Sequence, residues 1–289
     1  MKVYKLINSF QIPILIQSLH VEAQDTLPRY SGLLGLSKSI EFDSKLLIDF
    51  DGYKLIFIPV NNYILDRTYY YDIEDASGFY GLNALGRNWF FQTGTSIVDM
   101  LKHLLTEKCI FEGVNGVLGN PVVIGRSIPR GQAILNIIND LCLDIYYTDT
   151  FVIRDIPKTI SKSITVDTWS ENYTSGQRYN SITVSGVIRG GAYSVTVKDY
   201  EDIIINGEAS KIYESKIVCD KYNLERLANL LLEKQSRYEY TIKIPTQDVK
   251  INDLIIIKNN RLNQAKKLRV TKLVITGNLM EVTGANIAS

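Results

Sequence analysis

The sequence has few of the side chains that most often build metal and redox sites. Only three cysteines and two histidines occur among its 289 residues. Cys109, Cys142 and Cys219 are far apart and none belongs to a CxxC pair, so neither a disulfide framework nor a zinc site is expected. Buried thiols in a reducing compartment are the better expectation. His20 falls in a β-like segment and His103 on a predicted helix, so their positions do not pair them for catalysis.

An excess of charge and a long apolar run are also missing. The formal net charge of +1 leaves no global basic field, so stable binding of nucleic acid through its phosphates is not indicated. No apolar run approaches the roughly 20 residues that span a bilayer. The segment Ile12–Ile16 is short, contains Pro13 and ends at Gln17, so it does not form the core of a signal peptide. We expect a product that stays in the cytoplasm unless another route exports it, with no membrane insertion of its own.

Motifs for catalysis or cofactor binding are absent from the sequence. No HExxH, Walker or GxSxG pattern occurs, and Gly81–Gly86 fits an ordinary loop. Trp89 and Trp169 are compatible with a sugar-binding cleft, but packing in a core or an interface is the stronger expectation for both. The sequence therefore assigns no catalytic, cofactor-binding or metal-binding residue, and no enzyme activity is expected.

The composition is that of a folded protein with more than one domain. Hydrophobic residues make up 45% and charged residues 22% of the chain, which argues against disorder. A chain of 289 residues can bury a sizeable core and usually divides into domains.

The first third, to about Phe91, reads mainly as β-strand. Strands are predicted at 40–42 and 45–50, at 53–58 after an Asp51-Gly52 turn, and at 66–73 after a loop at Asn61-Asn62. Tyr69, Tyr70 and Tyr71 put tyrosine on both faces of the last strand. Such a strand suits either a partner chain on one face or burial beneath a loop, and both readings stay open.

The middle, from about Gly94 to Asp155, mixes helix and strand. Thr95-Ser96 predicts the start of a helix that continues to Leu105. A second helix follows Pro129 and Gly131 and leads into a strand at 145–154, with a bend at 148–150. One apolar stripe runs along this second helix: Ile134, Ile137, Ile138 and Leu141.

The last part returns to strand. Residues 157–177 are polar and read as a connection with at most one short strand. A hairpin is predicted for 181–198 around Arg189–Gly191, and Asn223 is the expected cap of an amphipathic helix. Further strands are predicted at 240–244, 253–258, 268–276 and 279–283, with the last two joined at Gly277-Asn278.

A weak internal echo connects the two ends of the chain. A turn, the strand 53–58, a loop and a long strand resemble a turn, the strand 254–258, a loop and a long strand. The prediction is an α+β, mainly β fold with two small β-barrel-like domains joined by a mixed α/β segment. The expected bounds are 1–92 for the N-terminal barrel domain, 93–156 for the α/β segment, 157–180 for a connection, and 181–289 for the C-terminal barrel domain with a helix at about 223–237.

Several segments carry a resemblance to a known family. They are Thr93–Leu101, Arg126–Gln132 with its helix, and Leu143–Asp149, and together they look like the middle of phage tail baseplate hub proteins. Ile182–Gly186, followed by Asp199–Ile205 and the helix at Asn223, looks like the second β region of that family. The resemblance covers most of the chain and rests on the order of the segments. The family includes hubs of contractile tails, prophage-type hubs and the N-terminal part of type VI secretion spikes.

The resemblance implies a structural role and a set of partners. Three copies would form a ring that closes the sixfold tail tube and carries the central spike or tip, with two barrels per chain giving six similar units. The implied partners are the chain itself as a homotrimer, the tail tube or distal tail protein, baseplate wedge proteins, the spike or tip protein and the tape measure protein. The implied location is the tail baseplate of a virion or a phage-tail-like particle such as a bacteriocin. No catalytic residue is carried over, and because the chain stops at Ser289 no peptidoglycan-degrading domain is expected after the hub region.

Two other functions remain as alternatives. The 18 tyrosines fit a receptor- or carbohydrate-binding module of the tail tip, which should show an exposed aromatic cluster with a groove. A cell-wall hydrolase would clear peptidoglycan in a gel assay. For a hub, the surface facing the lumen should be mixed or acidic rather than basic, so that it does not trap a passing chain of phosphates.

Overall fold

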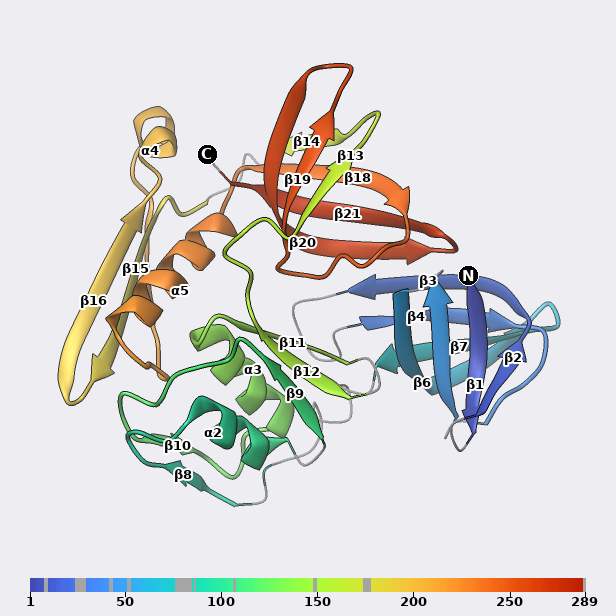
Figure 1. Cartoon of the computed structure of the whole chain (residues 1–289), viewed down its shortest axis with the longest axis horizontal. Coiled ribbons are helices and arrows are strands. Elements are labelled where there is room, and N and C mark those ends of the chain that lie inside the picture. The colour runs from blue at the N-terminus through green and yellow to red at the C-terminus, as the bar shows by residue number, and fades with distance from the viewer. Residues whose placement is uncertain are drawn as a thin grey trace.

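Most strands belong to one large open β-sheet in the computed structural model (Figure 1). The structure describes the chain except residues 8–9, 24–29, 42–43, 51–52, 76–84, 86, 106–107, 148–149, 174–177 and 288–289. Within the described residues this sheet has 13 strands. The early strands are β1 (Lys2–Ile7), β2 (Phe10–Ile14), β3 (Ile16–Ala23), β4 (Tyr30–Leu36), β5 (Lys45–Phe50), β6 (Tyr53–Leu65) and β7 (Thr68–Asp75). The late strands are β13 (Lys162–Thr165), β14 (Ser170–Tyr173), β18 (Tyr238–Pro245), β19 (Leu254–Asn259), β20 (Gln264–Thr276) and β21 (Leu279–Asn286).

The two ends of the chain form neighbouring parts of this sheet. Strands predominate over helices in the described residues, so the prediction of a mainly β, α+β fold is confirmed. The strand order is β14-β18-β21-β20-β3-β4-β7-β6-β5-β1-β2, while β19 pairs with both β20 and β13. The antiparallel pair of β20 with β3 joins the late strands to the early ones. The prediction of two β-barrel-like domains needs one correction. Among the described strands neither half closes into a barrel, and β3 of one half pairs with β20 of the other.

Two sets of five strands repeat the same pairing. We call β3–β7 the N-terminal unit, and β14 with β18–β21 the C-terminal unit. In each unit the first strand pairs with the second, the second with the fifth, the fifth with the fourth and the fourth with the third. The second to fifth strands have 7, 6, 13 and 8 residues in the N-terminal unit and 8, 6, 13 and 8 in the C-terminal unit.

The pairing registers of the two units also agree. Both long strands, β6 and β20, contain a bulge at the same place, at Val60 in one and Thr271 in the other. A two-residue turn then joins each long strand to the fifth strand, Asp66-Arg67 in one unit and Gly277-Asn278 in the other. Each residue of β6 is therefore equivalent to the residue 211 positions later in β20.

The echo in the sequence is present in the structure, but shifted by one strand. The sequence matched 53–58 with 254–258, whereas the pairing matches β6 with β20 and β5 with β19. A short apolar run fits more than one strand of a sheet, and only its neighbours fix which one it is.

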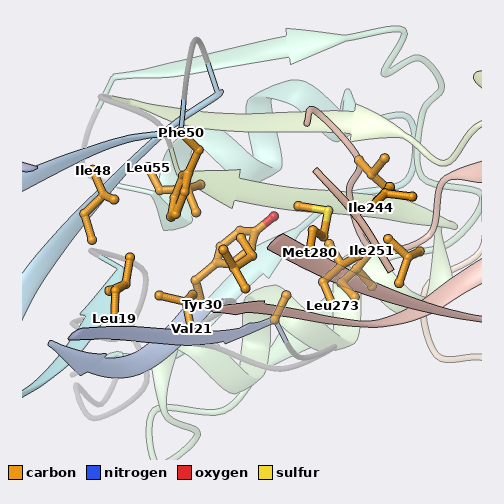
Figure 2. Packing of buried hydrophobic residues seen from close by; sticks show 14 of the residues in the cluster. Leu19, Val21, Tyr30, Ile48, Phe50, Leu55, Ile244, Ile251, Leu273 and Met280 are labelled. Atoms are coloured by element: carbon orange, nitrogen blue, oxygen red, sulfur yellow. The ribbon is translucent and has the colours of Figure 1, made fainter. Parts of the chain in front are cut away.

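Alternating side chains place the same face of both units in a shared core. The buried equivalent pairs are Leu46 and Ile255, Ile48 and Ile257, Phe57 and Leu268, and Tyr71 and Val282. All of them belong to one cluster that runs across the junction of the units (Figure 2). Burial of each such side chain contributes roughly 1.5–3 kcal/mol relative to leaving it exposed.

A central module of helices and short strands lies beside the N-terminal unit (Figure 1). Its elements are β8 (Trp89–Phe91), α2 (Ile97–Leu104), β9 (Cys109–Glu112), β10 (Val122–Ile124), α3 (Arg130–Asp140), β11 (Leu143–Tyr147) and β12 (Phe151–Asp155). The predicted stripe on α3 is confirmed, since all four of its residues are buried. Ser96 occupies the N-cap of α2 as predicted, although its side chain makes no capping hydrogen bond. The predicted strand 145–154 is two antiparallel strands, β11 and β12.

A lateral module packs one helix on a three-stranded sheet (Figure 1). Its elements are β15 (Ser181–Ile188), β16 (Gly191–Lys198), α4 (Tyr200–Asn206), β17 (Ser210–Glu214) and α5 (Lys221–Glu233). The predicted hairpin is β15–β16. The predicted cap of α5 is wrong, because Asp220 is the N-cap and its Oδ1 accepts from the N–H of Asn223 at 2.8 Å. Asn223 instead donates from Nδ2 to the carbonyl of Asp140 at 3.1 Å.

Three other predicted segments need correction. Ile40 and Glu41 lie outside any strand, because the backbone of Ile40 is bonded through both its N–H and its carbonyl to the Tyr71 hydroxyl. The loop expected at Asn61-Asn62 is part of β6, where the bulge replaces a break in the strand. The polar connection at 157–177 supplies two strands, β13 and β14, because the main-chain groups of polar residues pair as well as those of apolar ones.

Some predictions concern residues outside the described part of the chain. These are Phe42, the Asp51-Gly52 turn, the residues 148–149 of the predicted bend, and 81–84 with 86 of the predicted loop. The predicted domain bounds stay a prediction. No helix in the described residues is long and apolar enough to cross a membrane.

Candidate assembly surface

The structure does not bring the two histidines together. His20 lies on β3, where its ring nitrogens are 3.2 Å from Thr276 Oγ1 and 3.2 Å from Glu22 Oε1. His103 lies on α2 of the central module, and its ring meets those of Trp89 and Phe91 edge-on, with centroids 6.1 and 6.2 Å apart. Each ring therefore has its own packing environment.

Both tryptophans pack against hydrophobic clusters. Trp89 contacts the core of the central module, and Trp169 meets Tyr240 edge-on in the C-terminal unit, with ring centroids 6.0 Å apart. The packing reading of Trp89 and Trp169 is thus the one that the geometry supports.

No disulfide joins any two of the three cysteines. Burial raises the pKa of Cys142 to about 12 and the pKa of Cys219 to about 11, so both remain protonated at neutral pH. Within the described residues, no group of three or more His, Cys, Asp and Glu side chains could hold a metal ion.

Asp140 is a buried carboxylate that connects two modules. It ends α3, and it accepts hydrogen bonds from the Tyr213 hydroxyl at 2.7 Å and from the N–H groups of Lys216 and Ile217 at 2.9 and 3.0 Å. Burial raises the pKa of Asp140, while these donors act in the opposite direction. Through these three hydrogen bonds, the Asp140 carboxylate of the central module binds the lateral module.

A half-buried arginine and a buried one make further connections between modules. Arg154 of β12 pairs with Asp144 at 3.1 Å and with Asp253 at 2.8 Å, beside the C-terminal unit. Arg269 of β20 pairs with Glu233 of α5 at 2.8 Å and also donates to the carbonyls of Pro157 and Asn252. A surface hollow between α5 and β20 is lined in part by Glu233 and Arg269, which are bonded to each other. These charges fasten parts of the chain to one another, which favours a scaffold over a reaction centre.

Exposed apolar side chains stand out on two parts of the surface. One set lies on β2 and the end of β6: Phe10, Ile12, Val60, Ile64 and Leu65. The other lies on the short helix α4 and on β17: Tyr200, Ile204, Ile205 and Ile212. Exposed apolar residues that gather on one part of a surface are a common feature of sites that contact other molecules. Sequence reasoning did not single out either set, although the run Ile203–Ile205 within polar sequence was the available signal for the second.

Comparison with solved structures shows which known proteins share the fold of this chain. The sequence matches no protein-family model and no curated protein. A tail protein of Neisseria meningitidis MC58 superposes with a TM-score of 0.72 at 12% identity, covering 99% of this chain and 96% of that one. The chain has the fold of phage tail proteins.

Other solved structures share the phage-tail fold. The prophage tail protein gp18 of Listeria monocytogenes superposes with a TM-score of 0.68 at 10% identity, covering 99% of this chain and 94% of that one. The c3393 protein of Escherichia coli, a component of the type VI secretion system with structural similarity to the T4 tail proteins gp27 and gp5, superposes with a TM-score of 0.60 at 9% identity. The match covers 100% of this chain and 78% of c3393. These matches agree with the resemblance found in the sequence.

Proposed function

We propose that the chain is the structural baseplate hub of a phage tail or a phage-tail-like particle. In this role three copies form a ring between the end of the sixfold tail tube and the threefold central spike or tip. The phage-tail fold over the whole chain supports a tail role. The repeat of two units with one pairing register carries the more specific claim, because three chains with two units each present six similar units to the tube.

The partners follow from this position. They are two further copies of the chain, the tail tube or distal tail protein, baseplate wedge proteins, the spike or tip protein and the tape measure protein. The chain needs neither sequence-specific binding of nucleic acid nor membrane insertion. We propose no enzymatic activity, in keeping with the buried charges that join its modules. The division at 1–92, 93–156, 157–180 and 181–289 belongs to the same proposal.

The mass of the purified assembly tests the proposal. Light scattering should give three times the 32.8 kDa of one chain, either alone or once the tube-end protein of the same particle is added. Electron microscopy of the particle should place the protein in a threefold layer below the tube. A protein that stays monomeric with and without the tube-end protein contradicts the proposal.

The lumen and the rival functions have their own tests. A trimer whose lumen is lined by many of the 32 Lys and Arg residues would reject the mixed or acidic lumen. Peptidoglycan clearing in a gel would favour the hydrolase, and specific binding of cell-surface glycan to the isolated chain would favour the tail-tip module. A hub should show neither activity.

A further inference from the structure

The seam between the two units inside one chain has a defined register. β3 of the N-terminal unit pairs antiparallel with the end of β20 of the C-terminal unit. The opposed residues are Ala23 and Leu273, Glu22 and Val274, Val21 and Ile275, and His20 and Thr276. β3 occupies the edge of β20 that β19 leaves uncovered beyond Arg269.

The repeat gives each strand of this seam an equivalent elsewhere in the chain. β14 is the equivalent of β3, because Tyr173 opposes Tyr238 as Ala23 opposes Tyr30. The end of β6 is the equivalent of the end of β20, with Ile64 in the place of Ile275.

Both equivalent edges are open in the single chain. β5 pairs with β6 only as far as Phe57, and among the described residues no strand pairs with that edge of β6 beyond it. β14 pairs with β18 on one edge and with no described strand on the other. Each strand of the internal seam thus has an equivalent strand, β14 or the end of β6, whose corresponding edge pairs with no described strand.

We infer that β14 of one chain pairs antiparallel with the end of β6 in a second copy of the chain. The register follows from the internal seam: Tyr173 opposes Asn62, Asn172 opposes Tyr63, Glu171 opposes Ile64, and Ser170 opposes Leu65. This pairing rests on the proposed ring of copies and specifies the contact that builds it.

The exposure of equivalent residues supports the pairing. Ile275 is 1% exposed at the internal seam, whereas its equivalent Ile64 is 64% exposed. Tyr30 is 2% exposed, and Figure 2 shows it between residues of the N-terminal unit, such as Val21, and residues of the C-terminal unit, such as Leu273. Its equivalent, Tyr238, is also a tyrosine and is 44% exposed. The side chains that the internal seam buries are thus exposed at the outer edges.

The open edges carry features that protect unpaired strands before assembly. β14 is only four residues long and carries Glu171 where β3 carries the buried Val21. Short edge strands and edge charges both discourage pairing with wrong chains. On β6 the N–H of Asn62 is bonded to the Asn61 side chain at 2.9 Å, so this group has a partner within the chain.

The pairing is head to tail, because β14 and β6 are different surfaces. Each added chain leaves one open β14 and one open β6, so chains can be added until a ring closes. If every seam repeats the internal one, the successive units are related alike, and the proposed ring of three chains would contain six equivalent units.

Disulfide trapping tests the register. Opposed residues of antiparallel strands have Cα atoms about 4.5–5.5 Å apart, within the range that a disulfide spans. The chain with Tyr63→Cys and Asn172→Cys should form dimers and trimers that reducing agent dissolves. The matched control, Tyr63→Cys with Glu171→Cys, places the second thiol on the opposite face of the strand and should stay monomeric on the gel, as should the wild-type chain with its three native thiols.

The outcomes separate this pairing from the proposed function. A trimer by light scattering with no crosslink, or with equal crosslinks in the control, overturns the pairing and leaves the hub role standing. Crosslinked open oligomers without a closed trimer support the pairing and contradict the hub role. Monomers throughout, with no crosslink, overturn both.

A charge placed in the seam gives a second measurement. Ile64→Asp should raise the concentration needed for half-assembly about tenfold or more, because its carboxylate would directly oppose that of Glu171 in the seam. Val123→Asp on β10 is the matched control, since Val123 is 68% exposed and lies outside the seam. Equal effects of the two variants would contradict the pairing.

Discussion

The N-terminal and C-terminal units share one pairing register but are built from different side chains. Where the first has Phe57 and Tyr71 in the core, the second has Leu268 and Val282. The positions agree in burial and in apolar character, while the residue types differ. The comparison shows that register is set by the apolar pattern and by the two-residue turn, and does not need matching residues.

The outer faces of the two units differ, and this difference reflects what packs on them. Leu47 and Ile56 of the N-terminal unit are buried in the core of the central module. Their equivalents in the C-terminal unit are Ile256 and Lys267, which are half-buried and belong to no hydrophobic cluster of the described residues. One unit is therefore a platform for the central module, while the other has Lys267 and Arg269 on the corresponding face, with Arg269 paired to Glu233 of α5.

The largest effect is expected from breaking the shared core in either unit. Phe57→Ala and Leu268→Ala should each lower the free energy of unfolding by about 3–5 kcal/mol, because both side chains are fully buried at equivalent positions. Urea unfolding measures the loss. Phe90→Ala, at an exposed position on β8, is the control and should change stability little. A loss confined to one unit would show that the units do not share one core.

The next effect concerns a charge that only the C-terminal unit has. Arg269 stands where the N-terminal unit has Ile58, and its main charged partner is Glu233. Glu233→Ala should cost about 3 kcal/mol in the free energy of unfolding, because it leaves the buried guanidinium without a carboxylate. The double variant Arg269→Ile with Glu233→Leu should be destabilised less than Glu233→Ala, as measured by thermal unfolding. A larger loss in the double variant would mean that the bonds of Arg269 to main-chain carbonyls matter more than the ion pair.

A smaller effect distinguishes the two turns. Gly277 has φ of 60° and its equivalent Asp66 has φ of 48°, both in the left-handed region. Gly277→Ala should cost about 1 kcal/mol, since a Cβ is disfavoured there, and Asp66→Gly should be neutral or slightly stabilising. Melting temperatures of the two variants check the signs. Equal destabilisation of both turns would contradict the argument from backbone conformation.

The smallest effect is expected on the charged outer face. Lys267→Ile copies the residue type of Ile56 into the C-terminal unit, where this position is half-buried and lies outside the hydrophobic clusters of the described residues. The free energy of unfolding should change by no more than about 0.5 kcal/mol in urea unfolding. A gain of several kcal/mol would show that this face has an apolar partner within the chain.

Much of the local structure could be predicted, because local signals specify it. The stripe of Ile134, Ile137 and Ile138 predicts α3, and Gly277-Asn278 between apolar strands predicts the last hairpin. The cap of α5 was misplaced by three residues because both Asp220 and Asn223 are good caps in isolation. For the candidate surface, the sequence indicated only that tyrosines are numerous. It did not predict that Ile64 is exposed, because an isoleucine in a strand has the same sequence pattern whether its partner strand is present or missing.

The sequence by itself determined the helices α2, α3 and α5, the last hairpin with its turn at Gly277-Asn278, and the resemblance of the chain to tail hub proteins. Only the tertiary structure decided that β3 joins β20, that the polar segment at 157–177 supplies β13 and β14, and that Ile275 is buried while Ile64 is exposed. The physical reason is that side-chain periodicity records which face of a strand is buried. The edge of a strand presents main-chain groups that every residue except proline shares, so the choice of partner strand leaves little trace in the sequence.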